Sequence, residues 1–216
     1  YVPCVQLIGA VPVTIELKNE NQFRLTPEEL LAAITDKTKI LILAFPSNPT
    51  GAVMTKEDLE PIAKICQEKD IYVISDEIYS ELTYGGEKHC SISSLPGMKE
   101  RTIVINGFSK AYAMTGWRLG YALAPEVIAH QMTKIHQFAI MCAPTTSQYA
   151  AIEAIKNGDA DIEKMCKSYD QRRRFLLKKF EEIGLPCFEP HGAFYVFPCI
   201  KEFGITSDEF ATRLLR

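Results

Sequence analysis

The sequence predicts an α/β fold with a mostly parallel sheet, followed by part of a smaller α+β region. Two observations carry this prediction. Short apolar runs, typical of strands buried on both faces, alternate with helical segments through the first two-thirds of the chain. After residue 185 the composition shifts to prolines, glycines and short strand-like runs. We therefore expect a domain boundary near Gly158, which divides the chain into regions 1–157 and 158–216.

The strands are expected where short continuous runs of apolar or β-branched residues are bounded by polar or turn residues. In the first region these runs are Val11–Leu17, Ile40–Ala44, Ile71–Ser75, Thr102–Asn106 and Leu119–Ala124. A further strand is expected at Ala193–Phe197 in the second region.

The helices are predicted from apolar periodicity and from capping residues. Thr26 and Thr55 each precede acidic residues, which favour the first turn of a helix. The helix after Thr55 should bury one face, made of Leu59, Ile62, Ala63 and Cys66. Further helices are expected at Glu126–Gln137, Ser147–Lys156 and Asp161–Ile183, and after a cap at Ser207.

Composition narrows the choice of partners and compartment. The net charge is −3 and no apolar run is long enough to span a bilayer, so neither nucleic acid nor a membrane is an expected partner. The seven cysteines include no C-x-x-C pair. We expect mostly buried, reduced thiols in a cytoplasmic protein, and no metal site. The chain starts at Tyr1 rather than at a methionine, which favours an incomplete chain.

A lysine stands just beyond one predicted strand. Lys110 follows the strand Thr102–Asn106, a costly place for an amine unless it has chemistry to perform. It could form an imine with an aldehyde cofactor. Arg118 could pair with a phosphate of that cofactor, and Ser109 adds a hydroxyl donor. The alternative is a surface lysine and a solvated arginine.

Polar residues also follow the two preceding strands. Asp76 could keep a pyridine nitrogen protonated, and Tyr79 could donate to a phenolate oxygen of the same ring. Asn48 could bond that oxygen too. The alternatives are that Asp76 caps a helix, that Tyr79 packs, and that Asn48 belongs to an ordinary turn. Glu77 should point away from Asp76, since neighbours on a strand face opposite sides, which argues against a paired acid and base.

The segments Asn48–Gly51, Asp76–Tyr79 and Gly107–Gly120, in this order and spacing, resemble the class I and II aminotransferases. These are fold-type I enzymes that use pyridoxal 5′-phosphate (PLP), and the likeness continues to Pro190–Tyr195. It implies a PLP-binding large domain over 1–157 without its N-terminal part, and the start of a small domain over 158–216. It also implies amino acid and 2-oxo acid substrates and a homodimer at full length.

The resemblance assigns roles residue by residue. Lys110 resembles the Schiff-base lysine and proton carrier, and Asp76 the partner of the pyridine nitrogen. Asn48 and Tyr79 resemble the pair on the ring oxygen. Ser109 and Arg118 resemble phosphate ligands. Gly107 stands where the family often has serine, so one phosphate hydroxyl is missing.

The sequence segments around Lys110 and Asp76 look most like the aspartate/aromatic branch of the family. The family's phosphate loop, ring-stacking aromatic residue and substrate-carboxylate arginine have no counterpart in residues 1–216. Arg172, Arg173 and Arg174 are interpreted as a solvated face or local ion pairs instead. Two other functions stay open: a PLP-dependent carbon–sulfur β-lyase of the same fold, and a PLP-sensing domain of a transcription regulator.

Overall fold

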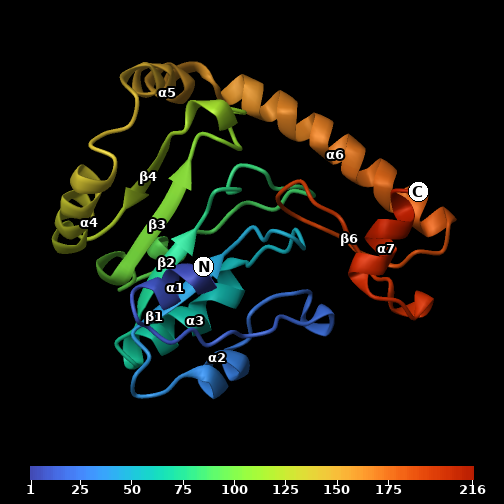
Figure 1. Ribbon diagram of the computed structural model, residues 1–216, viewed down its shortest axis with the longest axis horizontal. Coiled ribbons are helices and arrows are strands. Elements are labelled where there is room, and N and C mark those ends of the chain that lie inside the picture. Colours follow the sequence, from blue (N-terminus) through green and yellow to red (C-terminus); the bar gives the residue numbers. More distant parts are fainter.

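The computed structural model describes residues 1–216, and Figure 1 shows the arrangement of its elements. The helices are α1 (Val2–Leu7), α2 (Pro27–Ala33), α3 (Lys56–Glu68), α4 (Glu126–Ala139), α5 (Thr145–Asn157), α6 (Asp159–Glu182) and α7 (Ser207–Leu214). The strands are β1 (Ile40–Ala44), β2 (Tyr72–Asp76), β3 (Thr102–Gly107), β4 (Gly120–Leu123), β5 (Cys187–Phe188) and β6 (Phe197–Pro198).

The main sheet has the order β1-β2-β3-β4. Its first three strands are parallel and β4 is antiparallel to β3, which confirms the predicted α/β class with a mostly parallel sheet. Ala44 lies opposite Asp76, and Asp76 lies opposite Ile105. The carboxyl ends of β1, β2 and β3 therefore meet at one edge of the sheet, as the positions of the polar residues predict.

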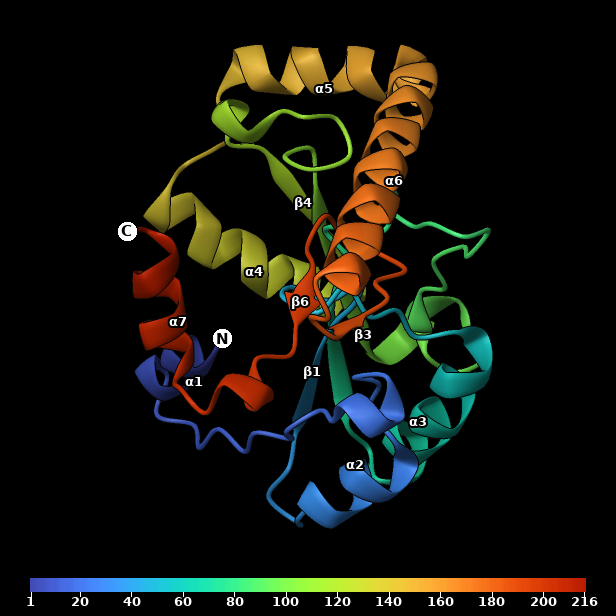
Figure 2. The same cartoon turned by 90° about the vertical axis from the view of Figure 1, so that its right-hand side faces the viewer.

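The helices on one side of the sheet begin as predicted. Thr26 and Thr55 both form capping boxes, with Glu29 and Asp58 reaching back to the cap. Figure 2 shows α2 and α3 on one side of the strands and α1 and α4 on the other. The predicted apolar face of α3 is buried in the main core, which also takes in residues of β1 and β2. Its members on α3 are Leu59, Ile62, Ala63, Ile65 and Cys66.

The other side of the sheet is covered only loosely, since neither α1 nor α4 has a buried residue. All four residues of β4 are exposed, with Leu123 at 61%, and α4 has no buried residue. The prediction that the strands are buried on both faces is therefore wrong for β4 in this chain. None of the helices combines the length and apolar character that crossing a bilayer needs.

Two predicted strands differ from the structure. Val11–Leu17 has no strand partner: Ile15 and Leu17 pack against the core, while Val11 is left exposed. In the segment Ala193–Phe197 only Phe197 belongs to a strand, because Ala193 is held by loop residues instead.

Two smaller predictions also need correction. The N-cap of α7 is Thr206 rather than Ser207, because the Thr206 hydroxyl accepts the Glu209 N–H. The cysteines are free, as predicted, but Cys66 alone is buried. The exposed cysteines are Cys4, Cys142 and Cys199, and the remainder are half-buried.

The second region starts where the chain turns between two helices. Gly158 is both the C-cap of α5 and the N-cap of α6. From there α6 runs across the molecule to β5, β6 and α7 (Figure 1). The chain then returns toward the sheet, where Gly192 pairs with Thr83 in an isolated bridge. The division at residue 158 into two domains stays a prediction.

Candidate functional site

Lys110 lies three residues beyond the end of β3, beside two aromatic rings. Its Nζ is 5.6 Å from the centre of the Tyr79 ring and 5.4 Å from the centre of the Phe194 ring. Both distances allow a cation–π contact. The ammonium group is thus held between a residue that follows β2 and a residue of the second region.

Tyr79 is buried, and its hydroxyl lies 2.5 Å from that of Tyr195. Burial raises the pKa of Tyr79, and the charge of Asp76 raises it further. Phe194 packs edge-on against Tyr79, with ring centres 5.2 Å apart. Tyr79 therefore packs, as the alternative interpretation predicts, and also presents its ring to Lys110 Nζ.

Asp76 is the last residue of β2 and one strand away from the end of β3. Its Oδ1 accepts the Ile78 N–H at 3.1 Å. Its Oδ2 accepts a hydrogen bond from the Tyr1 hydroxyl. Burial raises the pKa of Tyr1, and this contact raises it further. The carboxylate thus faces a donor that a protonated ring nitrogen could replace. Asp76 does not cap an α-helix, because none starts between β2 and β3.

Asn48 is exposed at the tip of the loop that follows β1. The loop is closed by the bond from Ser47 N–H to Ala52 O, at 2.8 Å. Its base is fixed by the second region, since the Gly51 carbonyl accepts the N–H groups of His191 and Gly192 at 3.0 and 2.9 Å.

Gly51 is required at this contact for two reasons. Its φ is +74°, and a Cβ there would lie 2.3 Å from Cβ of Pro190. A side chain would therefore be strained and would also clash. The loop that presents Asn48 and the segment that presents Phe194 form one packed unit.

Ser109 follows Phe108 just beyond β3, and Arg118 precedes Leu119 just before β4. The Phe108 N–H donates to the Leu119 carbonyl at 3.3 Å, which aligns the two segments. Arg118 is exposed, and its Nη1 donates to the Thr115 carbonyl at 3.0 Å. The guanidinium keeps further donors for an anion.

Gly107 lies in the tightest part of the same edge. A Cβ there would lie 3.1 Å from the Gly120 Cα and 3.1 Å from the Leu119 carbonyl oxygen. A serine at this position would require β4 to shift by a few tenths of an ångström. The close approach of the two strands therefore accounts for the glycine.

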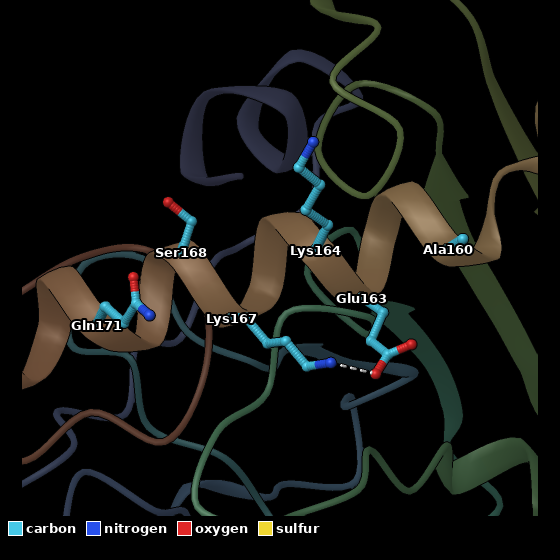
Figure 3. Close-up of a pocket in the computed structure, with 6 residues that line it drawn as sticks. All are labelled: Ala160, Glu163, Lys164, Lys167, Ser168 and Gln171. Atoms are coloured by element: carbon cyan, nitrogen blue, oxygen red, sulfur yellow. Dashed lines mark hydrogen bonds and ion pairs between the residues drawn. The ribbon is translucent and has the colours of Figure 1, made fainter.

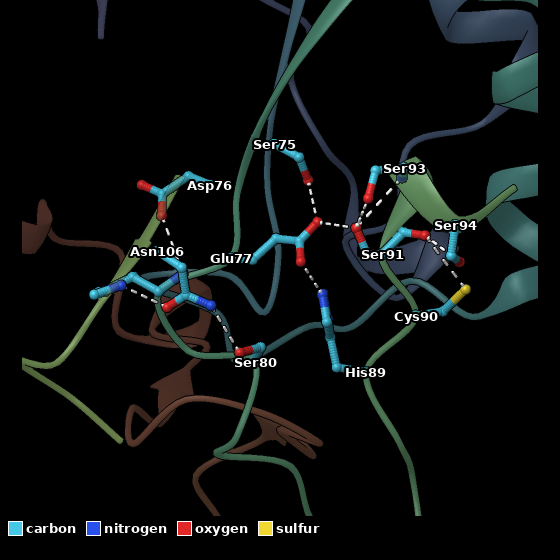
Figure 4. Close-up of polar contacts among 12 residues, drawn as sticks. Ser75, Asp76, Glu77, Ser80, His89, Cys90, Ser91, Ser93, Ser94 and Asn106 are labelled. Carbon is cyan, nitrogen blue, oxygen red and sulfur yellow. Dashed lines mark hydrogen bonds and ion pairs between the residues drawn. The ribbon is translucent and has the colours of Figure 1, made fainter. Parts of the chain in front are cut away.

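Glu77 forms a separate buried network behind Asp76. Figure 4 shows the two carboxylates pointing away from each other, as predicted for neighbours on a strand. Glu77 accepts hydrogen bonds from Ser75 at 2.9 Å and Ser91 at 2.6 Å, and pairs with His89 Nε2 at 2.8 Å. Burial alone would raise the pKa of Glu77, but the bonds and the charge of His89 outweigh it and lower the pKa.

Two of the three arginines of α6, Arg173 and Arg174, are engaged in ion pairs, while Arg172 lies over the ring of Tyr169. Arg173 contacts Asp170 and Glu189, and Arg174 contacts Asp170. The prediction of local pairs holds, but a solvated face is wrong for Arg173, whose side chain is 9% exposed. A surface hollow nearer the N-terminal end of α6, lined by Glu163, Lys167 and their neighbours, contains none of the predicted site residues (Figure 3).

The structure thus places Lys110, Asp76 and Tyr79 at one edge of the sheet, Ser109 and Arg118 on the segment that joins β3 to β4, and Asn48 on the loop after β1. Sequence reasoning assigned no role to Phe194, Tyr195 or the Glu77–His89 pair. Phe194 and Tyr195 lie in the segment Pro190–Tyr195, and the likeness of that segment to the family is the signal that could have drawn attention to them. No local pattern marks Glu77 and His89 as partners.

The α/β fold and the residues at this edge agree with the resemblance to the aminotransferases. The family model for aminotransferase class I and II matches residues 1–216, and the chain belongs to that family.

The chain is 52% identical to YugH of Bacillus subtilis, which is assigned to the aminotransferases only provisionally, and 48% identical to the aspartate aminotransferase of Pyrococcus abyssi. Both matches cover 100% of this chain, but 55% and 56% of those proteins. The crystal structure of the aromatic aminotransferase from Pyrococcus horikoshii superposes with a TM-score of 0.97, at 48% identity, over 100% of this chain and 58% of that one. The chain therefore spans about half the length of the relatives it matches.

Proposed function

We propose that this chain supplies the cofactor-binding part of a PLP-dependent aminotransferase of the aspartate/aromatic type. One observation carries the proposal: Lys110 beyond β3 lies against Tyr79, and Asp76 ends the neighbouring strand β2. A lysine amine, a carboxylate and a tyrosine hydroxyl at one sheet edge are the groups that a pyridine aldehyde needs. The named relatives, which are aspartate and aromatic aminotransferases, support transamination over β-lyase or regulatory functions.

The polar groups at this edge of the sheet fit PLP. Asp76 already accepts a hydrogen bond from a hydroxyl donor, so its carboxylate can receive a protonated ring nitrogen. Tyr79 keeps its proton because its pKa is raised, and can donate to the ring oxygen. The exposed amide of Asn48 could reach the same oxygen. Arg118 and Ser109 would hold the phosphate, and no ion pair has to be broken to free Arg118 for this.

The cofactor, when bound, would withdraw electrons from the α-carbon of a substrate linked to it through the amino nitrogen. The residues of this chain do the rest. Lys110 would hold the cofactor through Nζ, and would take up and return the substrate α-proton at that atom. Asp76 would keep a proton on the ring nitrogen, and Tyr79 would orient the ring. The expected substrates are an amino acid and a 2-oxo acid.

The decisive experiment uses the full-length protein and its visible absorption with PLP. Wild type should show the band of a lysine-bound cofactor, and Lys110→Ala should lose it. Lys99→Ala, which changes an exposed lysine before β3, is the matched control and should keep the band. A normal band in Lys110→Ala would refute the assignment. Release of ammonia and pyruvate from cystathionine without 2-oxoglutarate would instead favour the β-lyase.

A homodimer and a cytoplasmic location belong to the same proposal. Seven free cysteines, without a disulfide, fit a reducing compartment. Light scattering of the full-length protein would measure the oligomeric state, and a monomer would contradict the dimer.

A further inference from the structure

The hydrogen bond between Tyr79 and Tyr195 joins two distant parts of the chain directly at the lysine. The two hydroxyl oxygens lie 2.5 Å apart, and the rings meet edge-on with their centres 5.7 Å apart. Tyr79 contacts Lys110, while Tyr195 belongs to the segment that returns from α6. None of the roles predicted for the site residues involves Tyr195.

The segment that carries Tyr195 is firmly held. The Ala193 N–H donates to the Leu82 carbonyl at 2.9 Å, and the Tyr84 hydroxyl donates to the Ala193 carbonyl at 2.5 Å. Ala193 itself is fully buried. Tyr195 is therefore a fixed partner for Tyr79, because its backbone is anchored two residues away.

The direction of the bond matters because a tyrosine hydroxyl has one proton. If Tyr79 donates to Tyr195, its proton is used and its oxygen can only accept from another group. If Tyr195 donates to Tyr79, the Tyr79 proton stays available for an acceptor beside Lys110. A donated bond also makes the receiving hydroxyl a stronger donor, since linked hydrogen bonds polarise one another.

We propose that Tyr195 is a positioning residue of the cofactor site, which donates its hydroxyl proton to Tyr79 and so directs the Tyr79 proton toward the ring oxygen of the cofactor. This inference rests on the proposed PLP function. Tyr195 need not touch the cofactor, since it acts through Tyr79.

A double-mutant cycle on the full-length protein tests the inference, with the dissociation constant of PLP as the measurement. Tyr195→Phe keeps the ring and removes the hydroxyl, and should weaken PLP binding roughly threefold to tenfold, the range of one hydrogen bond. In the Tyr79→Phe background the same change should alter the dissociation constant less than about twofold, because the partner is gone.

Tyr84→Phe is the matched control. It removes a hydrogen bond that anchors the same segment but leaves the Tyr79–Tyr195 contact intact. It should lower the melting temperature of the cofactor-free protein while changing PLP affinity less than about twofold. Tyr195→Phe should show the opposite pattern, with a small change in melting and a clear change in affinity.

The outcomes separate this inference from the proposed function. Tight PLP binding by wild type with unchanged affinity in Tyr195→Phe overturns the role of Tyr195 alone. The role of Tyr195 is also overturned if Tyr195→Phe weakens PLP binding equally with and without the Tyr79 hydroxyl. The same holds if Tyr195→Phe and Tyr84→Phe lose affinity and melting temperature to the same extent, because Tyr195 then only anchors the segment. Failure of wild type to bind PLP removes the proposed function and the inference together.

Discussion

Oε2 of Glu77 lies 2.8 Å from Nε2 of His89, and this pair is the centre of a buried network one residue away from Asp76. Ser75 and Ser91 donate to the other carboxylate oxygen. The network ties the end of β2 to the segment that leads into β3. It therefore fixes the strand end from which Asp76 projects in the opposite direction.

Glu77→Gln should destabilise the protein at neutral pH by about 2 kcal/mol, because a buried network loses its charge and one acceptor. The pKa of the Glu77 carboxyl lies below its ordinary value of 4.5 in the folded chain. The contribution of the Glu77 charge to the free energy of unfolding is therefore complete above pH 4.5, and it is lost as the pH falls through the pKa of the folded state. Urea unfolding at several pH values should show the gap between wild type and variant closing below that pH.

The control for this experiment is Glu100→Gln, a change at an exposed glutamate just before β3. It should alter the free energy of unfolding by less than about 0.5 kcal/mol at every pH. A difference between wild type and Glu77→Gln that persists unchanged into acid would contradict the role of the charge.

Gly51→Ala should destabilise the protein by about 2–4 kcal/mol, since the added Cβ combines an unfavourable φ with a clash against Pro190. Gly204→Ala is a matched control: its φ is also positive, at +62°, but a Cβ there meets nothing within 4 Å. It should cost about 1 kcal/mol. Denaturant unfolding of both variants would measure the loss of stability from backbone strain alone and from strain combined with the clash. Equal losses in the two variants would show that the contact with Pro190 relaxes.

Asp76→Ala should lower the turnover number of the full-length enzyme about a hundredfold or more, because the ring nitrogen would lose the carboxylate that keeps it protonated. Asp70→Ala, at an aspartate that is 87% exposed, is the comparison. Steady-state kinetics with aspartate and an aromatic amino acid as donors would measure both. Turnover near that of wild type in Asp76→Ala would exclude the ring-nitrogen role.

Cys66 should be the slowest cysteine to react with a maleimide. Burial raises the pKa of its thiol to about 11, although the charge of Arg101 opposes the shift, so little thiolate forms at pH 8. Mass spectrometry after timed labelling should find Cys66 modified only on unfolding, whereas Cys142, which is exposed, reacts early. Early modification of Cys66 in the native protein would show that the core around α3 opens.

The sequence predicted the elements that local physics determines. Capping threonines placed the starts of α2 and α3, and the apolar runs placed β1 to β4. Val11–Leu17 has the composition of a strand, but a strand also needs a partner, and this chain gives it none.

The placement of the candidate site residues could be predicted because parallel strands put their carboxyl ends at one edge. Asp76 and Lys110 follow neighbouring strands, so their proximity could be inferred from order alone. Tyr195 could not be found this way. Its contact with Tyr79 depends on how the chain returns after α6, and no local pattern encodes that path.

The contact between Tyr79 and Tyr195 spans 116 residues of chain. During synthesis the ribosome must therefore release almost the whole of this chain before the surroundings of Lys110 are complete. Contacts of such long sequence separation close late and slow folding, because the loop entropy is lost before the contact forms. A nascent protein of this kind can build α3 and the first strands early, but the surroundings of Lys110 are complete only after Tyr195 has left the ribosome.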